Sequence, residues 1–286
     1  MGPFEQTTYQ PISYVVTGSL SDSVARSYGC FLSAIRSNGL QQQFDAFFLA
    51  SFLLFCCRMS TIPVIVIAYN NLSFVKNFVM QVYPYTKHIV IIDNCSTYDE
   101  QKKYYDSLQD PKIKVLRLAE NYGHSVIDKY GDQLGIPPVF VLSDPDLELN
   151  PKMPLDAIDQ LYALSVQYQR RRIGLALSIA DYDQFLDGEG KGIHDGEAPY
   201  WQHRIPNDSY ELYVSPTDTT FALHNRTFPD RWYDNIRIAG DFTCKHLPWY
   251  RDYIRNNVPK EELIEYYKNN ISSSIAKKYN LDFFTS

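Results

Sequence analysis

The sequence of 286 residues predicts an α/β sandwich, in which helices flank a mostly parallel central sheet. Short runs of apolar, β-branched residues recur from residue 62 onward, as expected for strands that are buried on both faces. Stretches with the apolar spacing of a helix separate these runs. Polar clusters follow directly after the runs, at the strand ends where such sheets bind their ligands.

Four strand–helix units account for the first part of the pattern. The expected strands span residues 62–68, 88–92, 112–118 and 138–143, with helices at 72–82, 99–108 and 125–134. The second part predicts a helix at 155–169, a strand at 173–179 and two strands, 211–215 and 219–224, that form a hairpin-like unit. From Pro248 onward the pattern is helical, including residues 261–270.

A Gly-rich, acidic segment between Asp181 and Asp208 interrupts this pattern. A loop of this length inside a compact domain is typical of a lid, a binding loop or a disordered segment. We therefore expect Gly188–Trp201 to be a mobile lid over the acceptor, because glycine lowers the cost of reshaping the backbone.

The pattern predicts three regions: an N-terminal extension at 1–60, one large domain at 61–250, and a helical segment at 251–286 packed on that domain. The extension contains an apolar stretch, Ala46–Cys57. A helix of that length reaches only about 18 Å, against roughly 30 Å of bilayer hydrocarbon, so it is too short to span a membrane. A docking helix, an interfacial anchor and a non-native extension ahead of Met59 all remain open.

Composition and charge indicate which partners the protein binds and in which cellular compartment it is located. Thirty-three acidic and 27 basic residues give a net charge of −6, which disfavours binding to nucleic acid through phosphates. The five cysteines have no regular spacing and are expected to be free thiols. Asn94-Cys95-Ser96 is a glycosylation sequon in a polar cluster, where a glycan would block a ligand. A cytoplasmic location is therefore expected, with contact at a membrane surface left open.

Two carboxylates, Asp144 and Asp146, follow the fourth strand in the sequence Asp-Pro-Asp. Oxygen ligands suit Mg²⁺ or Mn²⁺, and such an ion keeps open positions for a diphosphate. The metal would neutralise the charge that develops on a leaving nucleotide. The alternative is a turn whose Asp and Pro only start the next element, since this short motif is common.

Four ordered motifs carry a resemblance to a known family: Pro63–Asn70, Ile91–Thr97, Asn121–Gly123 and Leu142–Asp146. Together they resemble a nucleotide-sugar glycosyltransferase of the GT-A fold, similar to family 2. The resemblance implies an inverting sugar transfer with a carboxylate as the base. It also implies that Asp144 and Asp146 hold the metal and the diphosphate. The other residues expected to bind the nucleotide sugar are Ala68, Tyr69, Asn70, Asp93, Asn121, Gly123 and Lys245.

Several of these residues also have plain structural interpretations. Asp93 ends a strand and can accept hydrogen bonds from a nucleobase or ribose, or it can cap the helix that follows. Asn121 and Gly123 suit a turn as well as a close approach to a ligand. An aromatic content of 15% suits stacking on sugars, but these rings also fill cores.

The catalytic base is expected on the acceptor side, within reach of a hydroxyl group. Asp241 is the first candidate, because the preceding Gly240 frees the backbone to aim its side chain. Asp218 is the second, with orientation of the donor or the acceptor as its alternative role. The resemblance implies that His246 completes the metal shell or touches the diphosphate, and the charge of Lys245 suits the same group. The alternative for His246 is a packed or surface residue.

The sequence therefore predicts a metal-dependent glycosyltransferase that uses a UDP- or GDP-sugar donor and a glycan or other hydroxyl acceptor. Two alternatives remain. A sugar nucleotidyltransferase shares the α/β layout but usually has a Gly-rich, basic phosphate loop, and Tyr69–Leu72 contains neither Gly nor Lys. A catalytically inactive domain that binds glycans or nucleotide sugars has the same fold.

Overall fold

The computed structural model describes residues 59–186 and 188–268. Apart from Met59 and Ser60, the expected extension 1–60 lies outside the described residues, together with its apolar stretch Ala46–Cys57. Residues 269–286 of the expected C-terminal segment lie outside them as well. The boundaries at residues 60 and 250 therefore stay predictions. Within the described part of the chain, no helix is both long and apolar enough to cross a membrane.

A nine-stranded sheet forms the centre of the fold. Its strands are β1 (Val64–Ala68), β2 (Ile89–Asp93), β3 (Ile113–Arg117), β4 (Val139–Ser143), β6 (Arg172–Leu175), β7 (Arg204–Ile205), β8 (Leu212–Val214), β9 (Ala222–Asn225) and β10 (Ile236–Ile238). Two short strands, β5 (Leu147–Leu149) and β11 (Cys244–His246), pair with each other separately. The α-helices are α3 (Leu72–Val82), α4 (Asp99–Ser107), α5 (Val126–Tyr130), α6 (Ala157–Tyr168), α7 (Gly190–Glu197), α8 (Arg251–Asn257) and α9 (Lys260–Lys268).

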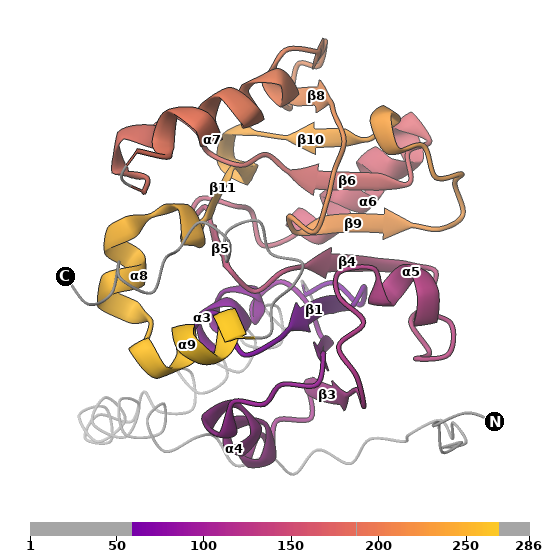
Figure 1. The fold of residues 1–286 in the computed structure, drawn as a ribbon. Helices are drawn as coiled ribbons and strands as arrows, with labels where there is room; N and C mark the ends of the chain where they lie inside the picture. Colours follow the sequence, from indigo (N-terminus) through magenta and orange to yellow (C-terminus); the bar gives the residue numbers. More distant parts are fainter. Residues whose placement is uncertain (1–58, 187, 269–286) are drawn as a thin grey trace, which may run out of the picture. The chain divides into compact units, whose positions relative to one another are not determined.

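The strand order is β3-β2-β1-β4-β9-β6-β10-β8-β7, and only β8 and β9 run against the other strands. The predicted α/β class with a mostly parallel sheet is confirmed. In Figure 1, β4, β6 and β10 point toward one edge of the sheet, where β5, β11 and α8 also lie. The polar clusters after the parallel strands therefore gather along this edge, as the sequence predicts.

Helices cover both faces of the sheet, because side chains alternate along the buried strands. On β1, Val64, Val66 and Ala68 pack into one apolar cluster with α3 and α6. Ile65 and Ile67 face the opposite side, where their cluster includes residues of α5. All five β1 side chains are at most 7% exposed, so the continuous apolar run reflects burial on two faces.

The expected hairpin between residues 211–215 and 219–224 is wrong. Strand β8 pairs with β7 and β10, whereas β9 pairs with β4 and β6. Two strands, β6 and β10, therefore lie between them. The connecting segment passes close to β6, where a Cβ added to Gly174 would lie 2.2 Å from Thr217 Cγ2. The absence of a side chain at Gly174 provides the room for this crossing, which adjacency in sequence does not reveal.

The expected loop at Gly188–Trp201 is also wrong, since residues 190–197 form α7 and residues 198–201 form the 3₁₀ helix η2. Each glycine in a helix costs about 1 kcal/mol relative to alanine. Tertiary contacts offset this cost: Ile193 packs on the larger core, and the ring of His194 lies 4.8 Å from that of Tyr182. At Gly190 an added Cβ would lie 2.3 Å from the Tyr182 carbonyl oxygen, so this glycine permits the close packing.

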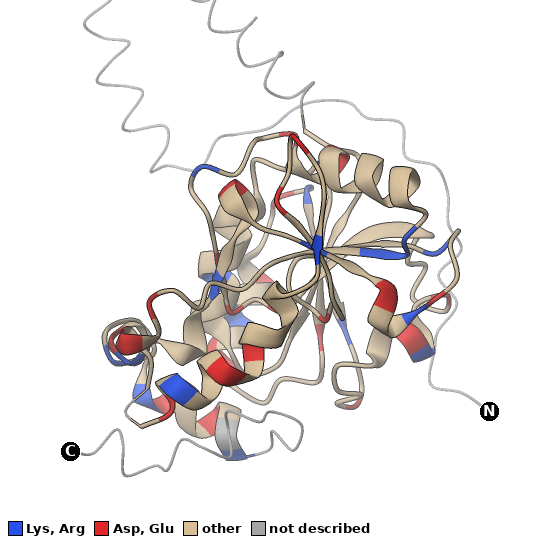
Figure 2. Ribbon diagram, turned by 90° about the horizontal axis from the view of Figure 1, so that it is seen from above, with Lys and Arg blue, Asp and Glu red and all other residues tan. Residues whose placement is uncertain are grey.

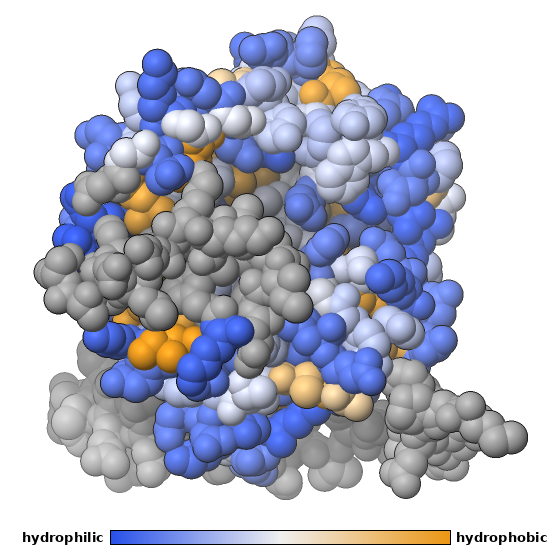
Figure 3. Space-filling view, in the orientation of Figure 1, coloured by the Kyte–Doolittle hydropathy of each residue, from blue (hydrophilic) through white to orange (hydrophobic). Residues whose placement is uncertain are grey.

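Charges of both signs are interspersed over the described ribbon (Figure 2). The face seen in Figure 3 is mainly hydrophilic, and hydrophobic residues surface there only in small patches. The expectation that the protein does not bind nucleic acid stays a prediction.

Candidate active site

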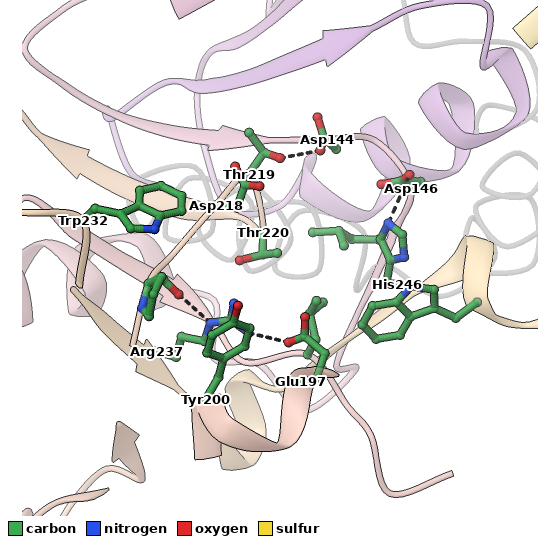
Figure 4. A pocket seen from close by; sticks show the side chains of 14 residues that line it. Asp144, Asp146, Glu197, Tyr200, Asp218, Thr219, Thr220, Trp232, Arg237 and His246 are labelled. Carbon is green, nitrogen blue, oxygen red and sulfur yellow. Dashed lines mark hydrogen bonds and ion pairs between the residues drawn. The ribbon is translucent and has the colours of Figure 1, made fainter. Parts of the chain in front are cut away.

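A cavity of about 220 Å³ lies beyond the carboxyl end of β4 (Figure 4). Four acidic, two basic and three aromatic side chains contribute to its lining: Asp144, Asp146, Glu197, Asp218, Arg237, His246, Tyr200, Trp232 and Trp249. The structure thus brings together both acids of the Asp-Pro-Asp motif, one of the two candidate bases and His246. It also adds residues that the sequence did not single out for chemistry.

Asp144 is tied to the loop that precedes β9. Its Oδ2 accepts a hydrogen bond from Thr219 Oγ1, and its backbone N–H donates to the Thr219 carbonyl oxygen at 2.9 Å. Burial and then the nearby Asp146 carboxylate raise the pKa of Asp144 well above its usual range, against the lowering effect of the Thr219 hydrogen bond. Asp218 raises this pKa further. Negative charge is therefore costly at this end of the cavity.

His246 reaches Asp146 through the pairing of β5 with β11. Strand β5 begins directly after Asp146, and the antiparallel register places His246 opposite Leu147. His246 Nε2 lies 3.4 Å from Asp146 Oδ2. His246 Nδ1 and Asp146 Oδ1 are buried without a hydrogen-bond partner among the described residues. Since buried polar atoms are usually hydrogen-bonded, this pair has unused bonding capacity.

Carboxylate oxygens at this point suit a divalent cation such as Mn²⁺ or Mg²⁺, and the imidazole nitrogen of His246 adds a ligand that transition metals accept more readily than Mg²⁺. Two of them, on Asp146 and His246, lie side by side and retain buried atoms without partners. Among the described residues, however, no three His, Cys, Asp or Glu side chains are grouped closely enough to hold a metal ion. Asp146 and His246 could therefore hold an ion only if other ligands, such as a bound diphosphate and water, completed its shell.

The segment between β8 and β9 delivers Asp218 to the cavity. Thr217 packs against Gly174, and Thr219 binds Asp144, so both neighbours of Asp218 are fixed. The Phe221 side chain is fully buried and packs edge-on against Phe78, with ring centroids 6.3 Å apart. These contacts hold the loop in place, while the Asp218 side chain remains exposed to solvent.

Asp241 and Lys245 do not line the cavity. Asp241 is exposed in the 3₁₀ helix η4 (Gly240–Phe242). Lys245 and His246 are adjacent in β11, so their side chains point to opposite sides of the strand. Lys245 Nζ lies 3.3 Å from Asp181 Oδ2 and 4.9 Å from the centre of the Tyr250 ring. Between the two acids considered as the base, the geometry thus brings only Asp218 to the cavity.

Glu197, Tyr200 and Arg237 form the wall opposite Asp146 and His246 (Figure 4). Arg237 Nη1 contacts Glu197 Oε2 at 2.8 Å, and its Cζ lies 4.3 Å from the Tyr200 ring centre. Sequence reasoning missed Glu197 and Arg237. A signal existed for Arg237, since a cation between two isoleucines in a short strand indicates a buried charge. No sequence signal pointed to Glu197, because it lies in the segment that was expected to be a loop.

A second part of the predicted site lies at the ends of β1 and β2. The Asn70 amide donates to Thr97 Oγ1 and to the Glu265 carbonyl oxygen, both at 3.0 Å. Its oxygen accepts from the backbone N–H groups of Thr97 and Tyr98. The Asn70 side chain is thus fully hydrogen-bonded within the protein, and helix α9 provides one of its partners.

Helix α9 also contacts the start of α3. The buried Glu262 carboxylate accepts hydrogen bonds from the Ser73 backbone N–H at 2.9 Å and from Ser73 Oγ at 2.7 Å. Burial raises the pKa of Glu262, although the bonds from Ser73 act in the opposite direction. Helix α9 therefore covers the end of β1, beside Asn70.

The remaining predicted nucleotide ligands at this edge also have local partners. Asp93 Oδ1 accepts from the Ser96 backbone N–H at 3.0 Å within the turn ahead of α4, which begins only at Asp99, so Asp93 does not cap that helix. Asn121 Oδ1 accepts from the Gly123 N–H at 2.9 Å. Gly123 has a φ of +69°, which favours glycine. Ala68 is fully buried, and its carbonyl oxygen accepts from the Asn94 N–H. Tyr69 is half-buried at the end of β1.

The family model described as glycosyl transferase family 2 matches residues 64–228, more than half of the chain. The match includes Asp144, Asp146 and Asp218 and ends before Arg237 and His246. The search among curated proteins found no match.

Two solved proteins resemble the chain at low sequence identity. The mannosyltransferase PcManGT from Pyrobaculum calidifontis, in complex with GDP-Man and Mn²⁺, is 14% identical, with a TM-score of 0.43. The match covers 76% of this chain and 65% of the mannosyltransferase, so the chain spans just under two thirds of that protein. TarS 1–349 from S. aureus, in complex with UDP-GlcNAc, is 12% identical with a TM-score of 0.38, and the match covers 77% of this chain and 69% of that chain.

Proposed function

The chain belongs to glycosyl transferase family 2, and we propose that it is a metal-dependent glycosyltransferase that moves a sugar from a nucleotide sugar to a hydroxyl acceptor. The observation that carries the proposal is the Asp146–His246 pair, with its buried, unpartnered atoms beside Asp144 and Asp218. Family membership alone gives the reaction class. The pair supports a working site at the end of β4.

Asp146 and His246 would hold Mn²⁺ or Mg²⁺, with Asp144 close by. Bound there, the ion supplies charge neutralisation for the departing diphosphate. The raised pKa of Asp144 supports this assignment, because two neighbouring carboxylates repel each other until a cation is present. The hydrogen bond from Thr219 keeps Asp144 oriented beside the pair.

Asp218 is the proposed base, in place of Asp241. A base must reach the acceptor hydroxyl, and Asp218 lines the cavity whereas Asp241 does not. An inverting transfer requires this carboxylate on the side of the sugar opposite the leaving diphosphate. In that role Asp218 accepts the proton of the acceptor hydroxyl as the new glycosidic bond forms.

The size of the cavity bears on how the donor would bind. Sites for whole ligands usually measure roughly 300–1,000 Å³, and this cavity has about 220 Å³. It therefore suits the sugar, while the nucleoside extends along the sheet edge toward β1, beside α9. A UDP- or GDP-sugar fits this arrangement, with its sugar in the cavity and its nucleoside along the sheet edge. The acceptor, the cytoplasmic location and closure of residues 188–201 over the ligand stay predictions.

One observation favours the alternative of an inactive binding domain. Asn70, expected to bind the nucleotide sugar, already has all its side-chain hydrogen bonds within the protein. If α9 stays in place, donor binding through Asn70 is blocked. Of the two ligands considered for the inactive domain, a glycan fits this blocked end better than a nucleotide sugar, and neither would be turned over.

Hydrolysis of a panel of nucleotide sugars with Mn²⁺ tests the proposal, because many transferases slowly transfer the sugar to water. The panel begins with GDP-mannose and UDP-GlcNAc, the compounds named in the similar structures. We expect one donor to be cleaved to nucleoside diphosphate and sugar, and chelation to stop the reaction. Binding of a donor without cleavage, in the presence of hydroxyl acceptors, would support the inactive domain instead.

A further inference from the structure

We propose that Glu197 and Arg237 form the subsite that recognises hydroxyl groups of the transferred sugar, with the rings of Tyr200 and Trp232 beside it. This inference rests on the proposed function and deepens it. It concerns which sugar the site accepts, and it assigns both side chains to binding.

Three contacts fix the position of the Arg237 guanidinium. Nη1 contacts Glu197 Oε2 at 2.8 Å, Nε donates to the Pro216 carbonyl oxygen at 2.9 Å, and Cζ lies 4.3 Å from the Tyr200 ring centre. The Arg237 side chain is 5% exposed and that of Glu197 is 17% exposed. A pair held this tightly is a preorganised recognition group, because little side-chain freedom remains to be lost on binding.

The pair keeps hydrogen-bonding capacity on both partners. Among the described residues, no hydrogen bond is made by Glu197 Oε1 or by Arg237 Nη2. Both side chains line the cavity. An acceptor and a donor on adjacent groups match two neighbouring hydroxyls of a sugar, each of which can donate and accept.

The charge of the pair favours a neutral ligand group over an anion. Arg237 and Glu197 neutralise each other, so the wall attracts no phosphate or carboxylate by net charge. The nearby rings offer apolar faces: Tyr200 stacks on the guanidinium, and Trp232 is 42% exposed. A pyranose has apolar C–H faces and polar edges, and aromatic faces beside hydrogen-bonding groups suit it.

The position of the Glu197–Arg237 pair favours contact with the donor sugar rather than with the acceptor. Figure 4 shows Glu197 and Arg237 across the cavity from Asp146 and His246. With the diphosphate at Asp146 and His246, the sugar joined to it enters the cavity and meets this opposite wall. The acceptor must instead approach from solvent, where Asp218 is exposed.

Calorimetry with two ligands in the presence of Mn²⁺ tests the inference: the nucleoside diphosphate alone, and the nucleotide sugar that the panel identifies. Glu197→Gln and Arg237→Lys should each lower the affinity for the nucleotide sugar by roughly 10- to 100-fold, as expected for the loss of a hydrogen bond to a charged group. Both variants should leave the diphosphate affinity unchanged. Arg231→Lys and Glu120→Gln, two exposed substitutions outside the cavity, serve as matched controls.

A donor that lacks one sugar hydroxyl separates recognition from a structural role. If the two residues only stabilised the fold, their substitution would not change the preference for the complete donor over the deoxy donor. The native protein should discriminate against at least one such deoxy donor, and Glu197→Gln or Arg237→Lys should reduce that discrimination. An equal loss of affinity for the nucleoside diphosphate and the nucleotide sugar, or no loss for either, would overturn this inference alone. Failure of the native protein to bind any nucleoside diphosphate would overturn the proposed function, and the inference with it.

Discussion

The ends of β1 and β2 and the cavity beyond β4 lie on the same edge of one sheet, yet they use polar side chains differently. At β1, Asn70 makes four hydrogen bonds within the protein, and α9 takes part in them. In the cavity, Asp146 and His246 keep buried atoms that find no partner within residues 59–186 and 188–268. Burial and the neighbouring acids raise the pKa of Asp144.

This difference separates structural from functional use of similar residues. A satisfied buried amide stabilises the local fold, because its desolvation is compensated. Unsatisfied, mutually repelling groups cost stability, and proteins keep them mainly where a ligand completes the site. The cavity, more than the closed end of β1, is therefore where substitutions should change function while leaving the fold intact.

The largest expected effect comes from the candidate base in the cavity. Asp218→Asn should reduce turnover by roughly 10²–10⁴-fold, because it removes the group that accepts the proton of the acceptor hydroxyl. Donor affinity should survive, since Asp218 is exposed and contributes little to the fold. Steady-state kinetics together with calorimetry of the donor measure both quantities.

Asp241→Asn is the matched control, being another exposed aspartate that lies outside the cavity. It should retain near-normal turnover. Loss of turnover in Asp241→Asn, with Asp218→Asn active, would return the role of base to Asp241.

A smaller effect is expected at the closed end, where Glu262 holds α9 against α3. Glu262→Ala leaves the half-buried Ser73 donors without their partner and should destabilise the docking of α9 by about 1–3 kcal/mol. Hydrogen exchange of the α9 amides should accelerate accordingly, while exchange in the central strands stays unchanged. Unchanged exchange throughout α9 would show that other contacts hold this helix.

The smallest effect concerns the pH dependence of stability at His224, far from the cavity lining. Burial, followed by the charges of Arg172, Arg171 and Arg226, lowers the pKa of His224 well below 6.5. The unfolded chain therefore takes up a proton first as the pH falls below about 6.5. Stability should decline there by at most about 1.4 kcal/mol per pH unit from this group.

His224→Phe should flatten that decline. The imidazole stacks on Phe140 with ring centroids 5.0 Å apart, and its Nε2 has no hydrogen-bond partner among the described residues, so a phenyl ring can replace it. Urea denaturation at pH 7.0 and 5.5 measures the difference. An equally steep decline in the variant would assign the acid sensitivity to other groups.

The parts of the fold that depend on local pattern were predictable from the sequence. Buried strands such as β1 and amphipathic helices such as α3 have strong periodic signals, and parallel strands bring their polar ends to one edge. The Asp144–Asp146 motif could be placed for this reason. Its later partner His246 was a prediction from family resemblance, and the pairing of β5 with β11 explains how the two approach.

The parts that depend on tertiary contacts were not predictable. Helix α7 forms despite its glycines because it packs on the core and on Tyr182. The Glu197–Arg237 pair exists only once that helix and β10 are in place. The crossing of residues 215–221 over Gly174 likewise separates two strands that are neighbours in sequence and brings Asp218, rather than Asp241, to the cavity.

Binding of UDP and GDP to Asp146→Asn, measured by calorimetry with and without Mn²⁺, tests the central claim most directly. Asp146 Oδ1 has no hydrogen-bond partner in the described part of the chain, so the substitution should leave the melting temperature nearly unchanged. The native protein and Asp241→Asn should bind one of the two nucleotides only with Mn²⁺, and Asp146→Asn should lose that binding. Undiminished Mn²⁺-dependent binding by Asp146→Asn would contradict the account.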